Sequence, residues 1–229
     1  MQSFAEESVN TLVQSELSFA KTASEKGIKT AFLSYLAEYS ILFRPNAVSG
    51  KEWTAAQPET PGVLIWEPSY AEISGSGDLG FTTGPYVYKT SRDSADGDYG
   101  QFFSIWKKQN DGSWKVLLDT GTPVKKEKTS LTTRTNKGSS VSNQEREKQQ
   151  KLVAEADLHP SILTDALLLY DQEYGKECTF AQNGTGISQS ADLAYFYGTF
   201  QCGATQGNYV RVWRNVDYWQ VAVDYRKRL

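Results

Sequence analysis

Two aspartates, Asp119 and Asp224, end two similar segments of the chain and are the acidic residues best suited to chemistry. Each follows a tryptophan, Trp114 or Trp219, by five positions. Because side chains alternate along a strand, this odd spacing predicts that each aspartate lies on the sheet face opposite its tryptophan. A carboxylate that reaches an apolar interior has a raised pKa and could act as a general base. The alternative interpretation is a salt bridge at the end of the strand.

Aromatic and basic side chains form a second candidate set. Alternation predicts that Phe102, Ser104 and Trp106 share one sheet face. It also predicts that Tyr209, Arg211 and Trp213 share the matching face of a later strand. These faces could line cavities, or both tryptophans could pack in a core or between domains.

Other polar residues have structural interpretations. Asp78 and Asp192 each precede a strand beside small residues, which favours a turn residue bonded to its own backbone over a catalytic acid. The one histidine, His159, precedes Pro160 at a helix start, which favours a capping or loop role. One histidine and two distant cysteines do not make a zinc site, and no glycine-rich phosphate loop is present. We therefore expect neither a metal nor a cofactor.

The two cysteines, Cys178 and Cys202, both lie in the second half of the chain. Two residues exclude a disulfide framework but allow a single bridge. We interpret them as two buried free thiols, because free cysteine is among the most buried residue types.

These candidate residues recur because the chain contains a duplicated segment. Asp78–Gly84 (DLGFTTG) is echoed by Asp192–Gly198 (DLAYFYG), and a second phrase ending in Asp119 is echoed by one ending in Asp224. A duplicated β-rich unit predicts two similar domains in tandem.

Periodicity predicts the elements of the first copy. Apolar residues every three to four positions predict a helix over 6–24 and a second helix from about 29 to 39. A loop follows, with turn residues at Pro45 and Gly50. Strands are predicted at 63–74, 79–90, 99–109 and 113–121, with turn residues between them.

The second copy is shorter before its sheet. A linker over 123–142, rich in charged and small polar residues, leads to a helix over 143–157 and a short helix over 162–169. Strands are predicted at 173–182, 192–203, 207–215 and 218–226. The predicted domains are therefore 1–122 and 143–229, separated by the linker.

Composition limits the partners. A formal net charge of −3 and a pI near 5.4 argue against a nucleic-acid partner, which favours a basic face. No apolar stretch approaches the roughly 20 residues that cross a bilayer. Met1 leads directly into polar residues, so we expect no signal peptide. Together with the low methionine and cysteine counts, this start favours a mature exported protein, periplasmic or secreted, over a cytoplasmic one.

Two phrases of the first copy resemble a known family. Ser76–Gly84 (SGDLGFTTG) and Trp106–Val116 (WKKQNDGSWKV) are similar to the nuclear transport factor 2-like superfamily, in its SnoaL-like and domain-of-unknown-function 4440 branches. The resemblance covers Leu12 to Asp119 and, more weakly, 187–225. It implies an α+β fold of two helix-then-curved-antiparallel-sheet cones, paired within the chain as a pseudo-dimer. The protein would then be a monomer or form further homo-oligomers.

The resemblance also implies a ligand cavity between helices and sheet, with Arg44 where related domains often carry a pocket-edge arginine. Arg44 could bind a ligand carboxylate there or form an ordinary surface ion pair. The residues expected to face a ligand are Tyr35, Tyr39, Arg44, Trp66, Tyr86, Phe102 and Trp106, with Tyr195, Arg211, Trp213 and Asp224 as second-copy equivalents. One hypothesis is a binding or scaffold protein without catalysis that holds a small apolar or amphipathic ligand. The other is an isomerase or lyase in which Asp119 is the base, Tyr39 or Tyr86 the hydrogen-bond donor, and Arg44 the anchor.

Overall fold

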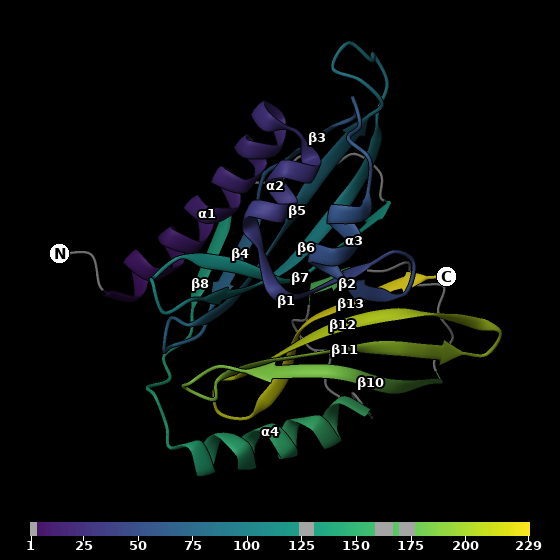
Figure 1. Ribbon diagram of the computed structural model, residues 1–229. Helices are drawn as coiled ribbons and strands as arrows, with labels where there is room; N and C mark the ends of the chain where they lie inside the picture. The colour runs from purple at the N-terminus through teal and green to yellow at the C-terminus, as the bar shows by residue number, and fades with distance from the viewer. Residues whose placement is uncertain (1–3, 124–130, 159–166, 170–176) are drawn as a thin grey trace. The chain divides into compact units, whose positions relative to one another are not determined.

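The computed structural model describes residues 4–123, 131–158, 167–169 and 177–229 (Figure 1). The chain divides into two compact units. The first unit comprises residues 1–44, 48–73 and 77–135, and the second comprises residues 45–47, 74–76 and 136–229. Each unit combines helix with one β-sheet, which confirms the predicted α+β class with two helix-and-sheet copies. The predicted domain boundaries, and the pairing of the copies as a pseudo-dimer, stay predictions.

The described residues of the first unit form three helices: α1 (Phe4–Lys26), α2 (Ile28–Tyr35) and α3 (Gly50–Ala56). α1 confirms the helix predicted at 6–24, and its apolar stripe is buried at Val9, Leu12, Val13, Phe19 and Ala23. Gly27 separates α1 from α2 with a φ of 91°, which glycine adopts without strain. Figure 1 shows α1 lying across one face of the first unit's sheet.

The sheet of the first unit has eight strands in the order β2-β1-β7-β6-β5-β4-β8, with β3 also paired to β5. The strands are β1 (Leu36–Phe43), β2 (Ala47–Ser49), β3 (Val63–Trp66), β4 (Tyr70–Ile73), β5 (Leu79–Lys89), β6 (Asp98–Lys108), β7 (Trp114–Pro123) and β8 (Thr132–Thr135). The antiparallel meander β5-β6-β7 confirms the strands predicted at 79–90, 99–109 and 113–121. β1 joins β7, and β8 joins β4, in parallel.

Three predictions for the first unit are wrong. The second helix ends at Tyr35, and residues 36–43 form β1, because their backbone pairs with β7 instead of continuing the helix. The predicted loop contains α3. The strand predicted at 63–74 is two strands, interrupted around Pro68, which has no backbone N–H to donate to a ladder.

The second unit contains α4 (Asn143–Leu158) and a five-stranded sheet in the order β10-β11-β12-β13-β9. The strands are β9 (Leu167–Leu169), β10 (Cys178–Ile187), β11 (Leu193–Cys202), β12 (Thr205–Asn215) and β13 (Trp219–Arg228). α4 packs against β10 and β11 along one face of this sheet, as Figure 1 shows. Val153 of α4, Phe196, Tyr209 and Trp213 lie in the core between them.

The predicted helix over 162–169 is wrong where the structure describes it, because Leu167–Leu169 pair in parallel with β13 as β9. The rest of that helix, the first residues of the strand predicted at 173–182, and His159 lie outside the described residues. Within the predicted linker, residues 132–135 form β8. None of the helices in the described ranges is long and apolar enough to cross a membrane.

Cys178 and Cys202 form a disulfide, so the prediction of two free thiols is wrong. The two residues are directly opposite each other in the antiparallel pair β10-β11, with Cα atoms 4.2 Å apart. This separation brings the two sulfurs within bonding distance. The bridge therefore joins the edge strand β10 to its neighbour.

Candidate functional site

A β-bulge in each unit determines where the two candidate aspartates point. In the first unit, Ile105 pairs with Leu118 but Trp106 pairs with Val116, so Leu117 is an extra residue in β7. In the second unit, Val212 pairs with Val223 but Trp213 pairs with Val221, so Ala222 is an extra residue in β13. An extra residue reverses the alternation of side chains beyond it.

The prediction that each aspartate lies opposite its tryptophan is therefore wrong. Trp114 points to the helices, donating its indole N–H to Thr11 of α1 at 3.1 Å. Asp119 lies on the same side of the sheet, where it accepts the Ser104 hydroxyl at 2.8 Å. In the second unit, Trp219 donates to Gln149 of α4 at 2.9 Å, and Asp224 also faces the interior.

Glu16 of α1 lies fully buried against the sheet of the first unit, with no exposed surface. Its Oε1 accepts the Trp66 indole N–H at 2.6 Å, and its Oε2 accepts the Thr82 hydroxyl at 2.5 Å and the Trp106 indole N–H at 3.0 Å. Burial raises the pKa of Glu16 to about 7; the hydrogen bonds oppose this shift, and the charge of Asp119 adds to it. Glu16 thus changes its protonation near neutral pH.

Aromatic rings fill the interior beside Glu16. The Phe19 ring centroid lies 5.0 Å from those of Phe32 and Tyr35, 4.9 Å from that of Trp66 and 6.1 Å from that of Trp106. Three residues expected to face a ligand, Tyr35, Trp66 and Trp106, thus pack around a side chain of α1. Phe102 is buried in the same core.

A second group of predicted residues comes together at the margin of this core. Burial raises the pKa of Tyr86, the charges of Asp119 and Asp98 raise it further, and Arg44 opposes them, so these side chains lie within electrostatic reach of Tyr86. The Arg44 guanidinium lies 5.1 Å from the ring centroid of Trp53. We call Arg44, Trp53, Tyr86 and Asp119 the rim cluster.

The second unit carries a buried ionic network in the equivalent place. Asp157 of α4 accepts hydrogen bonds from Tyr209 at 2.8 Å, from Arg211 at 2.9 Å and from the Trp213 indole at 2.8 Å. Arg211 also lies 3.5 Å from Asp224, which pairs with Arg226 at 2.7 Å. Two carboxylates and two guanidinium groups therefore balance one another in this interior.

Arg211 is held on its flat faces as well as at its donors. Its guanidinium lies 4.3 Å from the ring centroid of Phe180 and 5.0 Å from that of Tyr209. Burial alone would lower the pKa of Arg211, but Asp224 and Asp157 outweigh burial and raise it. The three predicted equivalents Arg211, Trp213 and Asp224 thus form the structural centre of the second unit.

Two other predicted residues lie away from these interiors. Tyr39 is 90% exposed, so the prediction that it faces a ligand or donates to a reaction intermediate is wrong. The reason is that it belongs to strand β1 and not to a helix. Tyr195 alternates with Ala194 and Phe196, which pack toward α4, so it lies on the other sheet face. Burial raises the pKa of Tyr195 to about 12, with a further contribution from Tyr197.

The two turn aspartates are tied to neighbouring side chains. Asp78 forms an ion pair with Lys107 at 2.5 Å. Asp192 accepts hydrogen bonds from the hydroxyls of Ser188 at 3.0 Å and Ser190 at 2.5 Å. Asp192 also accepts the backbone N–H groups of Gly75 at 2.9 Å and Gly138 at 3.1 Å. These partners are other residues and not the backbone of the aspartates themselves, but they agree with a structural interpretation of both.

Sequence reasoning missed Glu16 and Asp157, the helix carboxyls at the centre of each unit. A signal was available, because each acid interrupts an apolar stripe: Glu16 follows the buried Leu12 by four positions, and Asp157 follows the buried Val153 by four. An acid on the buried face of an amphipathic helix needs hydrogen-bond donors opposite it. The donors in both units include a tryptophan that the repeat had already singled out.

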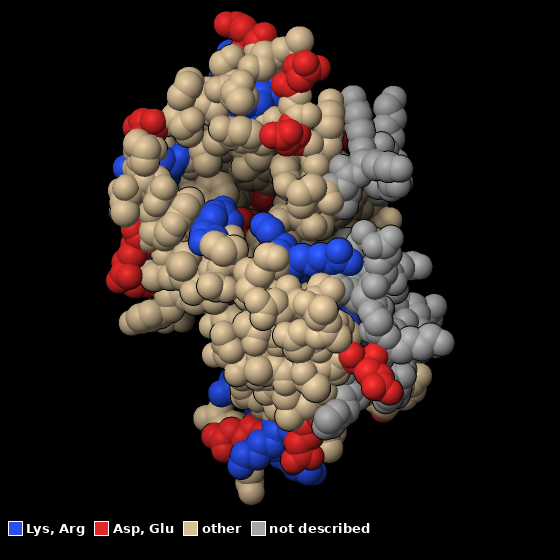
Figure 2. Space-filling model, turned by 90° about the vertical axis from the view of Figure 1, so that its right-hand side faces the viewer, with Lys and Arg blue, Asp and Glu red and all other residues tan. Residues whose placement is uncertain are grey.

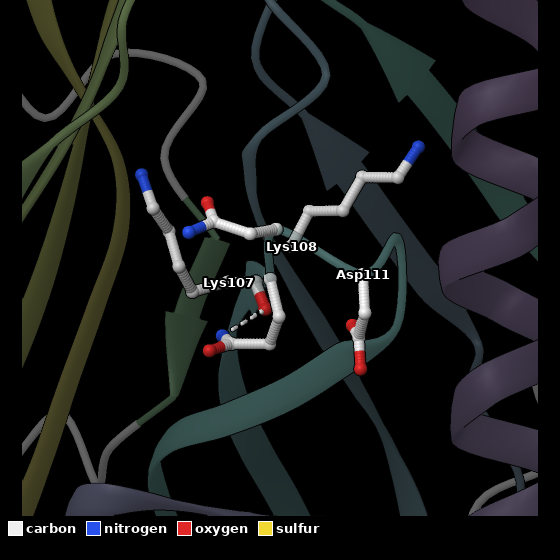
Figure 3. A pocket seen from close by; sticks show the side chains of 5 residues that line it. Lys107, Lys108 and Asp111 are labelled. Atoms are coloured by element: carbon white, nitrogen blue, oxygen red, sulfur yellow. Dashed lines mark hydrogen bonds between the residues drawn. The ribbon is translucent and has the colours of Figure 1, made fainter.

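An open hollow of about 480 Å³ lies at the β6-β7 hairpin, lined by Lys107, Lys108, Gln109, Asn110 and Asp111. Figure 3 shows Lys107 and Lys108 pointing to different sides, with Asp111 in the turn between the strands. The side-chain amide of Gln109 donates a hydrogen bond to the Lys107 carbonyl at 3.0 Å, drawn as the dashed line. Every lining residue is polar, so this hollow is unsuited to an apolar ligand.

Figure 2 shows acidic and basic side chains both distributed over one face of the molecule, so that face is not uniformly basic. No cluster of three or more potential metal-ligating side chains occurs in the part of the chain that the structure describes.

The chain matches no family model and no curated protein. Among solved structures it is similar to an NTF2-like protein of unknown function from Shewanella oneidensis, at 20% identity and a TM-score of 0.40, over 49% of this chain and 96% of that one. It is similar to a cystatin-like-fold protein from Nostoc punctiforme, at 14% identity and a TM-score of 0.40, over 51% of this chain and 90% of that one. A ketosteroid isomerase-like protein from Erwinia carotovora atroseptica matches at 14% identity and a TM-score of 0.42, over 52% of this chain and 98% of that one.

Each of these structures spans about half of this chain. The predicted helix-then-sheet architecture of two copies is confirmed by the element order of the first unit and by the four antiparallel strands of the second sheet.

Proposed function

We propose that the first unit binds a small amphipathic ligand at the rim cluster, without catalysis. The apolar part of the ligand would lie against partly buried side chains at the core margin, among them Trp53, Leu64 and Tyr86. An acidic group of the ligand would meet the guanidinium of Arg44. The observation that carries this proposal is the position of Arg44, over the Trp53 ring and within electrostatic reach of Tyr86.

An arginine held over an indole is suited to a carboxylate ligand. The ring orients the guanidinium without using its N–H groups, and the planar fork can donate two parallel hydrogen bonds to a carboxylate. Arg44 directs one nitrogen to the Phe43 carbonyl at 2.8 Å, which fixes the side chain and leaves further donors on the guanidinium.

Two features favour binding over proton abstraction. Glu16 and Asp119 are both buried and already accept hydrogen bonds from the protein, Glu16 from Trp66, Trp106 and Thr82, and Asp119 from Ser104. A general base must come within about 3 Å of the proton that it removes, directly or through one water. Because the Phe19 ring packs beside Trp106, a substrate would have to displace core side chains to reach Glu16.

Calorimetric titration with decanoate and decanol tests the proposal, because the two probes share an alkyl chain and differ in the carboxylate. Wild-type protein should bind both and prefer decanoate. Arg44→Gln should weaken decanoate binding roughly 10- to 100-fold, the value of a charge-assisted hydrogen bond, and leave decanol binding unchanged. Lys21→Gln, which removes an exposed charge from α1, is the matched control. Equal losses for both probes, or no binding by the wild type, would contradict the proposal.

One observation favours a second function, an isomerase or lyase acting by proton abstraction: the charge of Asp119 acts on the Tyr86 phenol, so a base and a donor lie near each other. With Tyr39 exposed, Tyr86 is the remaining donor. In this case the protein should turn over a steroid, polyketide or hydroxyacyl substrate, and Asp119→Asn should abolish the activity. Turnover that survives Asp119→Asn would exclude this mechanism.

We also propose that the protein is exported. The Cys178–Cys202 bridge supports this proposal, because disulfides persist in oxidising compartments and are rare in the cytosol. Thiol trapping in the producing cell, with maleimide added before lysis, should find both cysteines blocked; two free thiols in the cell would oppose export.

A further inference from the structure

Each unit buries two carboxyl groups beneath its helix, and the two units balance these carboxyls in different ways. In each unit a helix carboxyl, Glu16 or Asp157, accepts the indole N–H of the repeat-equivalent tryptophan. In each, a second carboxyl, Asp119 in the middle of β7 or Asp224 in the middle of β13, faces the same interior. Two acids therefore converge beneath the helix of each unit.

The cations of the second unit have no counterparts in the first. Arg211 precedes Trp213 by two positions, and the residue two positions before Trp106 is Ser104. Arg226 follows Asp224 by two positions, and the residue two positions after Asp119 is Gly121. The repeat thus replaces two guanidinium groups of the second unit with a hydroxyl and a hydrogen atom in the first.

The groups that face Glu16 are otherwise neutral. Trp66 of β3, Thr82 of β5 and Trp106 of β6 donate to it, and Asp119 of β7 is the charged group that acts on it. From α2, the nearby titratable side chain is Tyr35, which stacks on Phe19. Glu72 of β4 pairs with Phe81 of β5, whereas the preceding residue, Ala71, pairs with Thr82. Because side chains alternate along a strand, Glu72 and its ion-pair partner Arg134 of β8 lie on the sheet face opposite Thr82 and Glu16.

We propose that the interior of the first unit is a proton-binding switch, in which a proton on Glu16 does the charge-balancing work that Arg211 does in the second unit. The Thr82 hydroxyl, 2.5 Å from Oε2, can reverse its role and accept this proton's hydrogen bond. When the proton leaves, two carboxylates share a buried space, and the docking of α1 on the sheet weakens. The raised pKa of Glu16, about 7, agrees with this geometry.

The direction of the effect follows from linkage. The carboxyl of Glu16 has an ordinary value of 4.5 and a folded value of about 7. Its stabilising contribution is therefore fully present below pH 4.5 and is lost as the pH rises through 7. Above 7 the loss is complete, so α1 is held most firmly in mildly acidic solution and more loosely in alkaline solution.

Hydrogen exchange of the α1 amides, measured from pH 5 to pH 8.5, tests the proposal on the full chain. Glu16→Gln keeps the size of the side chain, and its amide can donate to Thr82 while its oxygen accepts from Trp66. Because intrinsic exchange chemistry is nearly the same for both proteins at each pH, their difference isolates Glu16. Between pH 5 and 7.5, the wild type should lose roughly 100-fold more protection in α1 than Glu16→Gln, a factor of about ten for each of the two pH units below 7 and little beyond. Glu25→Gln, on the exposed side of the same helix, should behave as the wild type.

Two further measurements keep the outcome decisive. A protonated-carboxyl band in the infrared spectrum should be present at pH 6, vanish by pH 8.5, and be missing from Glu16→Gln at both. Asp119→Asn removes the like charge that raises the pKa of Glu16, so the band should disappear at a lower pH than in the wild type; a shift to higher pH would contradict the proposal. Parallel exchange curves for wild type and Glu16→Gln, or a band that Glu16→Gln retains, would overturn the proposal.

Discussion

The indole N–H of Trp106 donates to the carboxyl of Glu16 across 3.0 Å, joining the central strand of the first sheet to the helix that covers it. The second unit repeats this bond between Trp213 and Asp157 at 2.8 Å. In both cases a large apolar ring buries itself and its one polar atom satisfies a carboxyl that the helix would otherwise bury at high cost. The bond between helix acid and strand indole is thus a shared feature of the two copies, although the sequences around the acids differ.

Replacing Trp213 with phenylalanine should destabilise the second unit by about 2 kcal/mol, because a buried carboxylate loses one donor while the ring volume is largely kept. Urea unfolding followed by far-ultraviolet circular dichroism measures the change. Tyr218→Phe, at an exposed position next to β13, is the control and should leave the unfolding curve unchanged. A neutral Trp213→Phe would mean that the other donors, Tyr209, Arg211 and Gln182, satisfy Asp157.

Truncating Phe19 to alanine should cost about 3–5 kcal/mol, because four aromatic neighbours lose their common contact and cannot collapse fully into the space. The apolar part of the resulting cavity should bind benzene, which would raise the melting temperature of the variant but not of the wild type. Leu17→Ala, on the partly exposed side of α1, should cost far less. A small loss for Phe19→Ala would show that the interior is loosely packed.

Substituting Arg211 by methionine should destabilise the second unit by about 3–5 kcal/mol, because Asp157 would remain buried without its cation, while Asp224 would keep Arg226. Denaturant unfolding at pH 7 gives the value. Adding Asp157→Asn to Arg211→Met should recover part of the loss, since it removes the carboxylate that Arg211 neutralises. Additive losses in the double variant would contradict a coupled network.

The disulfide predicts a redox dependence of stability. Its two cysteines are 24 positions apart, and closing a loop of this length should stabilise the folded state by about 3 kcal/mol in the chain-entropy model. The Cys178→Ser, Cys202→Ser double variant should therefore unfold at a lower denaturant concentration than the wild type. Dithiothreitol should lower the wild-type midpoint toward that of the variant and leave the variant unchanged.

The sequence predicted those parts of the fold that depend on local pattern. The meander strands β5, β6 and β7 follow from alternating side chains between strong turn residues, and α1 and α4 from their helical periodicity and position. The predicted end of the second helix was wrong because an apolar run such as residues 31–39 suits a helix or a buried strand equally well. Pairing with β7, a contact about 80 positions away in sequence, decides between them.

The candidate site was predicted in part for a related reason. Arg44, Tyr86 and Asp119 do come together, and Trp106 does face the helices. Asp119 reaches that interior only because Leu117 forms a bulge, and no rule of alternation anticipates an extra residue in a ladder. Glu16 escaped attention because an acid in a helix is usually solvated, and its donors come from strands 50 to 90 positions further along the chain.

The bulges at Leu117 and Ala222 each shift the alternation of side chains along the strand by one position. Beyond each of them, inward and outward positions exchange, and it is this exchange that brings Asp119 and Asp224 inside. The interval from tryptophan to aspartate should therefore tolerate many changes of residue type but not a change of length. Removing Leu117 or Ala222 would exchange the inward and outward positions in the remainder of the strand. The interior acid, and every side chain that follows it in the strand, would then lie on the opposite face.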